Sequence, residues 1–205
     1  EYITIITTGN STDFGNLTVA RYGLAGCSDS SRGVFAGGSG NINVIEYITI
    51  STPGNGTDFG DLTAGRQTLA GASNTTRGVF GGGSGVSNVI DYITIASTGN
   101  ATDFGDLTLA RQQVTGTAND TRAVFAGGYD GSGRTDTIDY ITIANTGNAT
   151  DFGNLIASIN YLASCASQTR AVFAGGLNGG AHDRIQYITM ASTGNATDFG
   201  DLLAP

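Results

Sequence analysis

Residues 77–107 read RGVFGGGSGVSNVIDYITIASTGNATDFGDL, and residues 122–155 repeat most of this stretch as RAVFAGGYDGSGRTDTIDYITIANTGNATDFGNL. The tetrapeptide Tyr-Ile-Thr-Ile/Met begins at Tyr2, Tyr47, Tyr92, Tyr140 and Tyr187, and Thr-Asp-Phe-Gly follows each copy. A period of about 45 residues, built from short β-type stretches without a helix-period apolar stripe, is typical of a β-propeller. The sequence therefore predicts an all-β ring of similar blades.

Each unit divides into four expected strands. In the first full unit these are residues 22–28, 32–36, 44–50 and 57–62, running from the ring axis outward. The small residues Gly23-Leu24-Ala25-Gly26 suit a crowded inner strand, whereas Phe59 and Leu62 suit the wider space between outer strands. Paired glycines such as Gly37-Gly38 follow the second strand, where they supply a turn with positive φ.

The unit boundaries predict a single repeat domain over residues 1–205. The third and fourth strands occur five times but the first and second only four, so residues 1–20 form an N-terminal half-blade. Full blades follow at 21–65, 66–110, 111–157 and 158–205. We expect a ring with five positions; the alternative is a subunit whose half-blade is completed by strands from another chain or from further sequence. The first residue is Glu rather than Met, which indicates a processed form or a fragment.

The repeat resembles the kelch type of β-propeller over essentially the whole chain. Gly82-Gly83, Tyr92, Phe104 and Arg111 occur in the order of the kelch pattern. Two departures stand out: Phe replaces the usual Trp in every unit, and Ile159 replaces the Arg that precedes the inner strand. The near-identity of the copies is also similar to repeat proteins of marine bacteriophages and related viruses. This second resemblance implies a virion or extracellular location.

The charge balance disfavours several partners. The formal charge is −8, from 17 acidic residues against nine Arg, and Lys is absent. Nucleic acids and anionic lipids are bound by clustered cationic side chains, so we expect neither as a partner. No apolar run approaches the roughly 18 residues of a membrane span, and we expect no membrane insertion.

Acidic and Arg residues recur at fixed positions of the unit. We expect them to form structural Arg–carboxylate pairs between blades, since guanidinium groups suit carboxylates. Calcium binding is the alternative, but the spacing lacks the dense ligand alternation of a calcium loop. We therefore expect no metal and no other cofactor. The residues concerned are Arg32, Arg77, Arg122 and Arg170 with Asp58, Asp103, Asp151 and Asp198.

No motif predicts catalysis. Asp-Phe-Gly lacks every other part of a kinase site, and the paired glycines precede no helix that could cradle a phosphate. His182 is the one histidine and has no nameable catalytic partner, so we expect an exposed loop residue. One histidine also cannot supply a copper-oxidase site. We predict a protein that is not an enzyme.

Cysteines and sequons each allow two interpretations. Cys27 and Cys165 hold one equivalent position, and we favour two small core residues over a disulfide. Five Asn-X-Ser/Thr sequons share one register, and we favour a repeated Gly-Asn turn over glycosylation. The five are Asn10, Asn55, Asn100, Asn148 and Asn195.

Differences between units indicate where function lies. The loops at 39–43, 84–88, 129–137 and 177–183 vary, while the strands barely change. We predict a non-enzymatic structural or adhesion module on a virion or extracellular surface. Its partners would be other copies, virion proteins, or a host-surface glycan or protein. The alternatives are a multivalent carbohydrate-binding lectin and, less favoured, a glycan-active propeller enzyme acting from the axial face. The candidate contact residues are Tyr129, Asp130, Arg134, Asn178, His182 and Arg184.

Overall fold

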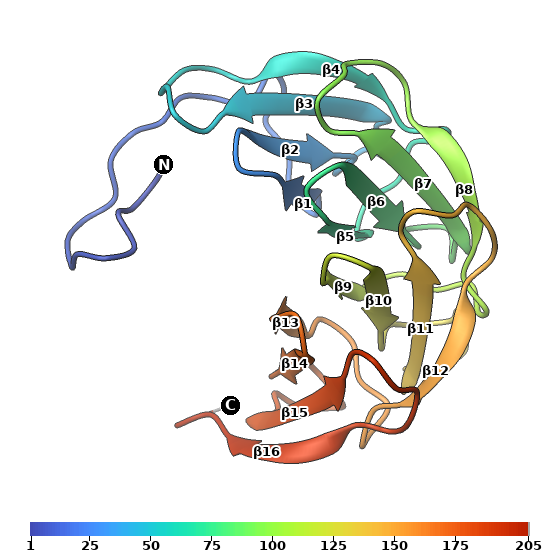
Figure 1. The fold of residues 1–205 in the computed structure, drawn as a ribbon. Helices are drawn as coiled ribbons and strands as arrows, with labels where there is room; N and C mark the ends of the chain where they lie inside the picture. Colours follow the sequence, from blue (N-terminus) through green and yellow to red (C-terminus); the bar gives the residue numbers. More distant parts are fainter. Residues whose placement is uncertain (205) are drawn as a thin grey trace.

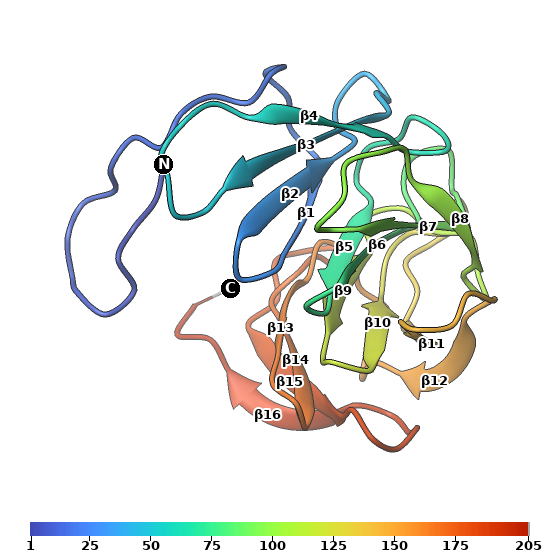
Figure 2. The ribbon, with the colours of Figure 1, turned by 45° about the horizontal axis from the view of Figure 1, so that its top comes forward.

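The chain forms four separate antiparallel sheets of four strands each. The computed structural model describes residues 1–204, and these contain strands, turns and loops but no helix. Figure 1 shows the sheets arranged side by side around an axis, with β1, β5, β9 and β13 innermost. The arrangement is open on one side, between the N-terminal segment and the last sheet (Figures 1 and 2). The all-β, blade-based prediction is confirmed at this level.

Each sheet is one blade, and its strands follow the chain from the axis outward. Blade 1 contains β1 (Ala25–Ser28), β2 (Arg32–Ala36), β3 (Val44–Thr49) and β4 (Thr57–Asp61). Blade 2 contains β5 (Ala70–Ser73), β6 (Arg77–Gly81), β7 (Val89–Thr94) and β8 (Thr102–Asp106). Blade 3 contains β9 (Thr115–Ala118), β10 (Arg122–Ala126), β11 (Thr137–Thr142) and β12 (Thr150–Asn154). Blade 4 contains β13 (Ala163–Ala166), β14 (Arg170–Ala174), β15 (Arg184–Thr189) and β16 (Thr197–Asp201).

The paired glycines after each second strand turn the chain as predicted. Gly37, Gly82, Gly127 and Gly175 have φ values of 68°, 70°, 63° and 68°, in the left-handed region that glycine adopts without steric cost. A Cβ atom at Gly37 would collide with the carbonyl oxygen of Arg66. The glycine is therefore required both by its backbone angle and by the close approach of the next blade's chain.

The hydrophobic core lies between blades rather than inside one blade. One cluster joins Val34, Ala36 and Phe59 of blade 1 to Phe80 and Ile95 of blade 2. Equivalent clusters join blade 2 to blade 3 and blade 3 to blade 4. Each blade thus presents one face to the blade before it, here called the leading face, and another to the blade after it, here called the trailing face. These two faces are different, so the contact is heterologous.

The outer strands are held together by a backbone clamp. Gly99 N and Ala101 N of blade 2 donate to the carbonyl oxygens of Phe59 and Asp61 at 2.7 Å. The Asn100 side-chain oxygen accepts a hydrogen bond from Asp61 N at 3.1 Å. Asn148 and Asn195 make the same contact with the preceding outer strand, and Asn55 makes it with Asn16 of the N-terminal segment. Four of the five repeated sequons therefore lie at blade junctions, which favours their structural interpretation.

The N-terminal segment has only the outer part of a blade. Tyr2 and Thr12 form one isolated antiparallel bridge, and Tyr2 stacks edge-on against Phe14 with ring centroids 5.8 Å apart. Gly54 N of blade 1 donates to Phe14 O at 2.7 Å, as in the clamps between full blades. We call residues 1–17 the half-unit. It contacts blade 1 but includes none of the sixteen named strands.

The cysteines are not bonded to each other. Cys27 is half-buried and Cys165 is exposed, and both are free thiols. Burial, with a smaller contribution from the nearby Asp29 carboxylate, raises the pKa of the Cys27 thiol to about 12. Within residues 1–204, the structure contains no helix long and apolar enough to cross a membrane.

Candidate binding site on the axial face

Four residues of equal register enclose a hollow near the ring axis. Gly23, Thr68, Gln113 and Tyr161 each lie in the linker that leads into the inner strand of a blade. All four have positive φ, at 66°, 55°, 58° and 57°. Three of them carry side chains that rarely adopt this conformation, and such backbone strain concentrates at functional sites.

A chain of backbone hydrogen bonds links these four residues. Thr68 N donates to Gly23 O at 2.7 Å, Gln113 N to Thr68 O at 2.9 Å, and Tyr161 N to Gln113 O at 3.3 Å. Each bond joins one blade to the blade before it. The four residues with positive φ are therefore joined in one hydrogen-bonded row around the axis. These bonds hold the backbone of the row in place, and so the points from which its side chains start.

The hollow has a volume of about 220 Å³. Its lining combines the four linker residues with the apolar residue that follows each of them, namely Leu24, Leu69, Val114 and Leu162. The apolar residues are similar from blade to blade, whereas the linker residues are Gly, Thr, Gln and Tyr. An apolar floor with a few polar groups is the usual composition of a small-ligand site. Tyr161, at 54% exposed, is the most accessible of the polar groups in this lining.

The variable loops lie next to this hollow. Tyr129 N and Leu177 N, which begin the loops of blades 3 and 4, donate to the carbonyl oxygens of Gln112 and Asn160 at 2.9 and 2.8 Å. Ser39 and Ser84 make the same contact in blades 1 and 2. Loop and linker therefore meet at one face in all four blades, which we call the axial face.

Three of the predicted contact residues belong to one ordered loop at this face. Tyr129 and Arg134 form an isolated bridge, and the Tyr129 hydroxyl donates to Gly131 O at 3.0 Å. The Asp130 carboxylate accepts the N–H groups of Ser132 and Gly133, both at 2.8 Å, and these bonds lower its pKa. The loop is thus held by its own side chains.

Arg134 is connected to the hollow through two side-chain contacts. Its Nε donates to Asn160 Oδ1 at 3.3 Å, and Asn160 Nδ2 donates to Gln113 Oε1 at 2.6 Å. Asn160 is buried and belongs to the linker of blade 4, so this link crosses the junction between blades 3 and 4. Arg134 itself is exposed. The loop residue Arg134 is therefore linked through Asn160 to Gln113, which lines the hollow.

The other three predicted contact residues lie further along, in blade 4. Asn178 is exposed at the tip of its loop, whereas His182 is half-buried, and its backbone N–H donates to Gly176 O at 3.0 Å. His182 therefore lies in a loop, as expected, but its side chain is only partly exposed. Arg184 is the first residue of β15 and lies opposite Asp201 of β16. These residues belong to blade 4 and make no described side-chain contact with Tyr129, Asp130 or Arg134.

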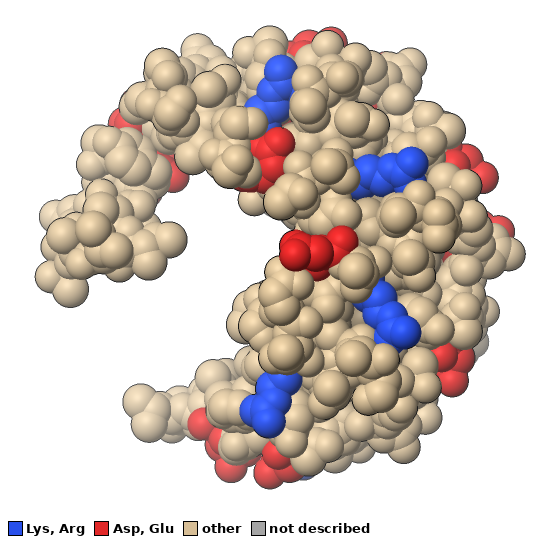
Figure 3. Space-filling view, in the orientation of Figure 1, with Lys and Arg blue, Asp and Glu red and all other residues tan. Residues whose placement is uncertain are grey.

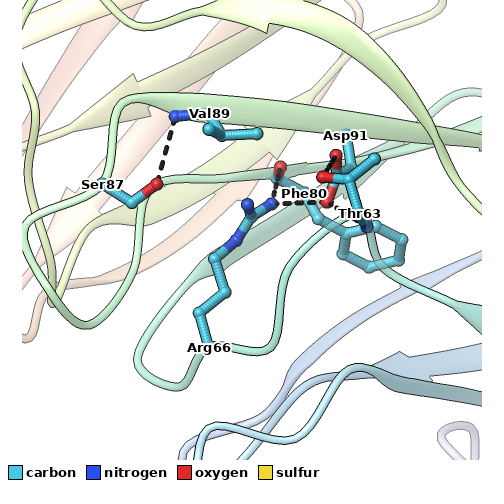
Figure 4. A network of polar contacts seen from close by, with 6 residues as sticks. All are labelled: Thr63, Arg66, Phe80, Ser87, Val89 and Asp91. Atoms are coloured by element: carbon cyan, nitrogen blue, oxygen red, sulfur yellow. Dashed lines mark hydrogen bonds and ion pairs between the residues drawn. The ribbon is translucent and has the colours of Figure 1, made fainter.

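The ion pairs differ from the predicted ones. Arg21, Arg66 and Arg111 pair with Glu46, Asp91 and Asp139 at 2.5, 2.8 and 2.5 Å, each inside a single blade and each with buried side chains. Figure 4 shows the second pair, where Arg66 also donates to Phe80 O at 3.2 Å and Thr63 donates to Asp91 at 2.6 Å. Burial lowers the pKa of Arg66 and Arg111, and the adjacent carboxylates oppose this change.

The four Arg residues expected to pair between blades bind aromatic rings and carbonyl groups instead. The Arg77 Cζ lies 4.7 Å from the centroid of the Tyr92 ring, and Arg77 Nη1 donates to Ile143 O of the next blade at 2.9 Å. Arg32 and Arg122 behave alike, and Arg170 has only the aromatic contact. None of the salt bridges among residues 1–204 involves Asp58, Asp103, Asp151 or Asp198. Figure 3 shows the basic side chains as separate patches along the ring, with acidic patches at its outer rim and near its centre.

Sequence reasoning did not single out the four linker residues. Their signal was available, because Gly23, Thr68, Gln113 and Tyr161 differ between units that are otherwise nearly identical. The side chains present are a phenol, an amide, a hydroxyl and a nearby guanidinium, which suit hydrogen bonding to a neutral or anionic polar ligand. In the described part of the chain, no group of three or more His, Cys, Asp or Glu side chains could hold a metal ion.

No protein-family model matches this chain, and no curated protein matches it. The class of this protein is therefore defined from its structure. It is an all-β protein of repeated four-stranded blades, with a hollow on one face that is lined by the linkers.

Proposed function

We propose that this chain is a non-enzymatic structural or adhesion module that binds one glycan or protein ligand at its axial face. The single observation that carries the proposal is the contrast between repeated and varied positions. Residues that hold blades together, such as Phe104 and Asn100, recur in every unit. The four linker residues that line the hollow do not recur, although their backbone conformation does.

This contrast favours asymmetric recognition. A site made of Gly23, Thr68, Gln113 and Tyr161 presents three different polar side chains, a hydroxyl, an amide and a phenol, to a ligand on the axis. Tyr and Arg residues in such positions often carry much of the binding energy, because they bury a large area and donate directed hydrogen bonds. A virion or extracellular location for this module rests on the resemblance of its repeats to those of phage and viral proteins.

The test is an array that displays glycans and purified cell-surface protein domains. We expect the labelled protein to bind a defined subset, and the Tyr161→Ala/Gln113→Ala variant to lose at least about tenfold in affinity for it. Ser97→Ala/Thr98→Ala, on an exposed outer hairpin, is the matched control and should keep the binding. Retained binding in the axial variant, together with loss in the hairpin variant, would contradict the proposal.

A second candidate, a multivalent lectin, has its own supporting observation. Small hollows of about 220 and 240 Å³ lie at the outer hairpins of blades 2 and 3, lined by equivalent residues that include Asn100 and Asn148. Ser, Thr and Asn side chains at these hairpins could bind sugar hydroxyl groups. This candidate predicts several equivalent weak sites per chain rather than one.

The glycan-active enzyme is the least supported alternative. Carboxylates do face each other across strands, as Asp139 and Asp151 do in blade 3. Asp139, however, is paired with Arg111 and buried. A pair of carboxylates acting on a glycosidic bond requires access to the substrate, which a buried, paired Asp139 lacks.

A further inference from the structure

A row of three polar side chains sets the polarity of the axial hollow at Gln113. The Arg134 guanidinium carries N–H donors only, so the Asn160 amide turns its oxygen toward Arg134 Nε, at 3.3 Å. The Asn160 NH₂ group then faces the other way and donates to Gln113 Oε1 at 2.6 Å. Because this bond uses the oxygen of the Gln113 amide, its NH₂ group is the part that a ligand in the hollow can contact.

Thr68, the neighbour of Gln113 in the linker row, has the opposite polarity. Its hydroxyl donates to Gln67 O at 2.7 Å, so the Thr68 oxygen is left as an acceptor. A Cβ atom at Gly23 would lie 3.6 Å from Thr68 Cγ2, and the glycine therefore leaves this side of Thr68 uncovered. The hollow thus presents a donor and an acceptor on adjacent linkers.

The surface between these two groups is apolar and uncharged. Leu69 and Val114 follow Thr68 and Gln113 in the chain, line the hollow and are buried. None of the eight lining residues is Asp, Glu, Lys, Arg or His, so a charged group would enter without a counter-charge, at a cost in free energy. The volume of about 220 Å³ is also smaller than the roughly 300 Å³ at which pockets for whole small molecules begin. The hollow therefore suits one small neutral group of a larger ligand.

An acetamido group has the required combination of donor, acceptor and methyl. Its carbonyl oxygen can accept from Gln113 Nε2, its N–H can donate to Thr68 Oγ1, and its methyl group can pack on Leu69 and Val114. The Tyr161 side chain is 54% exposed at the rim of the hollow. Its hydroxyl suits a second polar group beside the acetamido group. A sugar ring has such hydroxyl groups, whereas the methylene chain of an acetylated lysine has none.

We propose, on the basis of the axial site described under the proposed function, that the hollow recognises the acetamido group of a terminal N-acetylhexosamine. Gln113 and Thr68 hydrogen-bond the acetamido group, and Tyr161 contacts the sugar ring. Arg134 is a positioning residue, because it acts through Asn160 to keep the donor side of Gln113 toward the ligand.

The test is saturation-transfer NMR with the methyl glycosides of N-acetylglucosamine and N-acetylgalactosamine and of their parent hexoses, glucose and galactose. We expect at least one acetamido glycoside to bind, with its acetyl methyl protons receiving the largest saturation. The parent hexose should bind at least about tenfold more weakly, because Gln113 and Thr68 then lack partners. Gln113→Glu replaces the donor by an acceptor and should lower the affinity for the acetamido glycoside by a similar factor.

Arg134→Met tests the positioning role. Arg134 is exposed, so the substitution should leave folding unchanged, which a thermal unfolding curve verifies. Without its donor the two amides can turn over, and the preference for the acetamido glycoside over its parent hexose should fall by at least about threefold. Ser132→Ala, at an exposed position of the same loop, is the matched control and should keep the preference. An unchanged preference in Arg134→Met would contradict the role given to Arg134.

Other outcomes separate this inference from the proposed function. Equal binding of acetamido and parent glycosides, no binding of either, or saturation centred on the ring protons would overturn the inference. Preferential binding of a peptide that carries Nε-acetyl-lysine would overturn the assignment to a sugar. An array ligand that depends on Tyr161 and Gln113 but contains no acetamido group would sink the inference while the proposed function stands. If no ligand depends on these two residues, both fail.

Discussion

Ile159 and Gln186 occupy in blade 4 the two positions that form a buried ion pair in each of the other blades. A third position differs as well. In blades 2 and 3 a Thr hydroxyl donates to the carboxylate of the pair, and Ile156 stands at this position for blade 4. Gln186 Oε1 instead accepts the Ile156 N–H at 2.8 Å. Burying a carboxylate without its Arg would lower the stability of the fold. Blade 4, which lacks the Arg, therefore has the neutral Gln186 in place of the acid.

Removing the acid from an intact pair should be strongly destabilising. Asp139→Asn leaves Arg111 buried without a counter-charge, and we expect a loss of about 3–5 kcal/mol in the free energy of unfolding. Asp151→Asn, at an exposed position on the adjacent strand, should change it by less than about 0.5 kcal/mol. Urea unfolding of both variants checks this. Equal losses in the free energy of unfolding would show that the buried pair contributes no more to stability than the exposed Asp151.

Phe152 and Phe199 test the interface between blades directly. They occupy the same position of the same motif, yet Phe152 is 2% exposed between blades 3 and 4 and Phe199 is 57% exposed on the free trailing face of blade 4. Phe152→Ala should cost about 3–5 kcal/mol through lost burial and a cavity. Phe199→Ala should cost under about 1 kcal/mol. Thermal and urea unfolding of the two variants provide the comparison; a large loss for Phe199→Ala would mean that this face is covered in solution.

The two thiols should react at very different rates. Cys165 is exposed, whereas burial of Cys27 raises its thiol pKa to about 12 and so suppresses the reactive thiolate. At pH 8, iodoacetamide should modify Cys165 first in the folded protein, and both cysteines alike in urea. Peptide mass spectrometry locates the label. Preferential modification of Cys27 in the folded state would contradict the described packing.

The loop of blade 3 should depend on pH through Asp130. Hydrogen bonds from Gly133 and Ser132 lower the carboxyl pKa in the folded state. A lowered pKa contributes order that is present above the ordinary Asp pKa of about 3.9 and is lost as the pH falls through the folded-state pKa. NMR titration should therefore show a midpoint below that of a model peptide, with loss of loop structure at the acidic end. A midpoint at or above the peptide value would count against these contacts.

The repeated parts of the fold could be predicted from the sequence, since the strand positions follow alternation and turn residues that recur in every unit. The inner strands were placed too long: β1 begins at Ala25 rather than Tyr22, because Gly23 turns the chain with positive φ. The third and fourth strands also end one residue earlier than predicted, at Thr49 and Asp61 in blade 1. The ion pairs were assigned to the wrong partners. Arg32 and Asp58 both recur, but so do Arg66 and Asp91, and sequence spacing does not reveal which groups share a blade interior.

The predicted contact residues and the proposed site overlap only indirectly. Tyr129, Asp130 and Arg134 were singled out because their loop differs in length from the others, and Arg134 is linked through Asn160 to Gln113, which lines the hollow. Thr68 and Gln113 were missed. A sequence difference inside a repeated linker cannot be told from a neutral substitution until the structure shows that the linkers meet around one axis. Positive φ at non-glycine residues is a property of the folded backbone and has no direct sequence signature.

The number of ligand molecules bound per chain tests the central claim most directly. Titration calorimetry with the tightest-binding array ligand should give one site per chain, and Tyr161→Ala/Gln113→Ala should remove that site. One site lost in this way is the result expected from four different linker residues around a single hollow. A stoichiometry of two or more equivalent sites, unchanged by the axial substitutions, would contradict the account and favour recognition at the repeated outer hairpins.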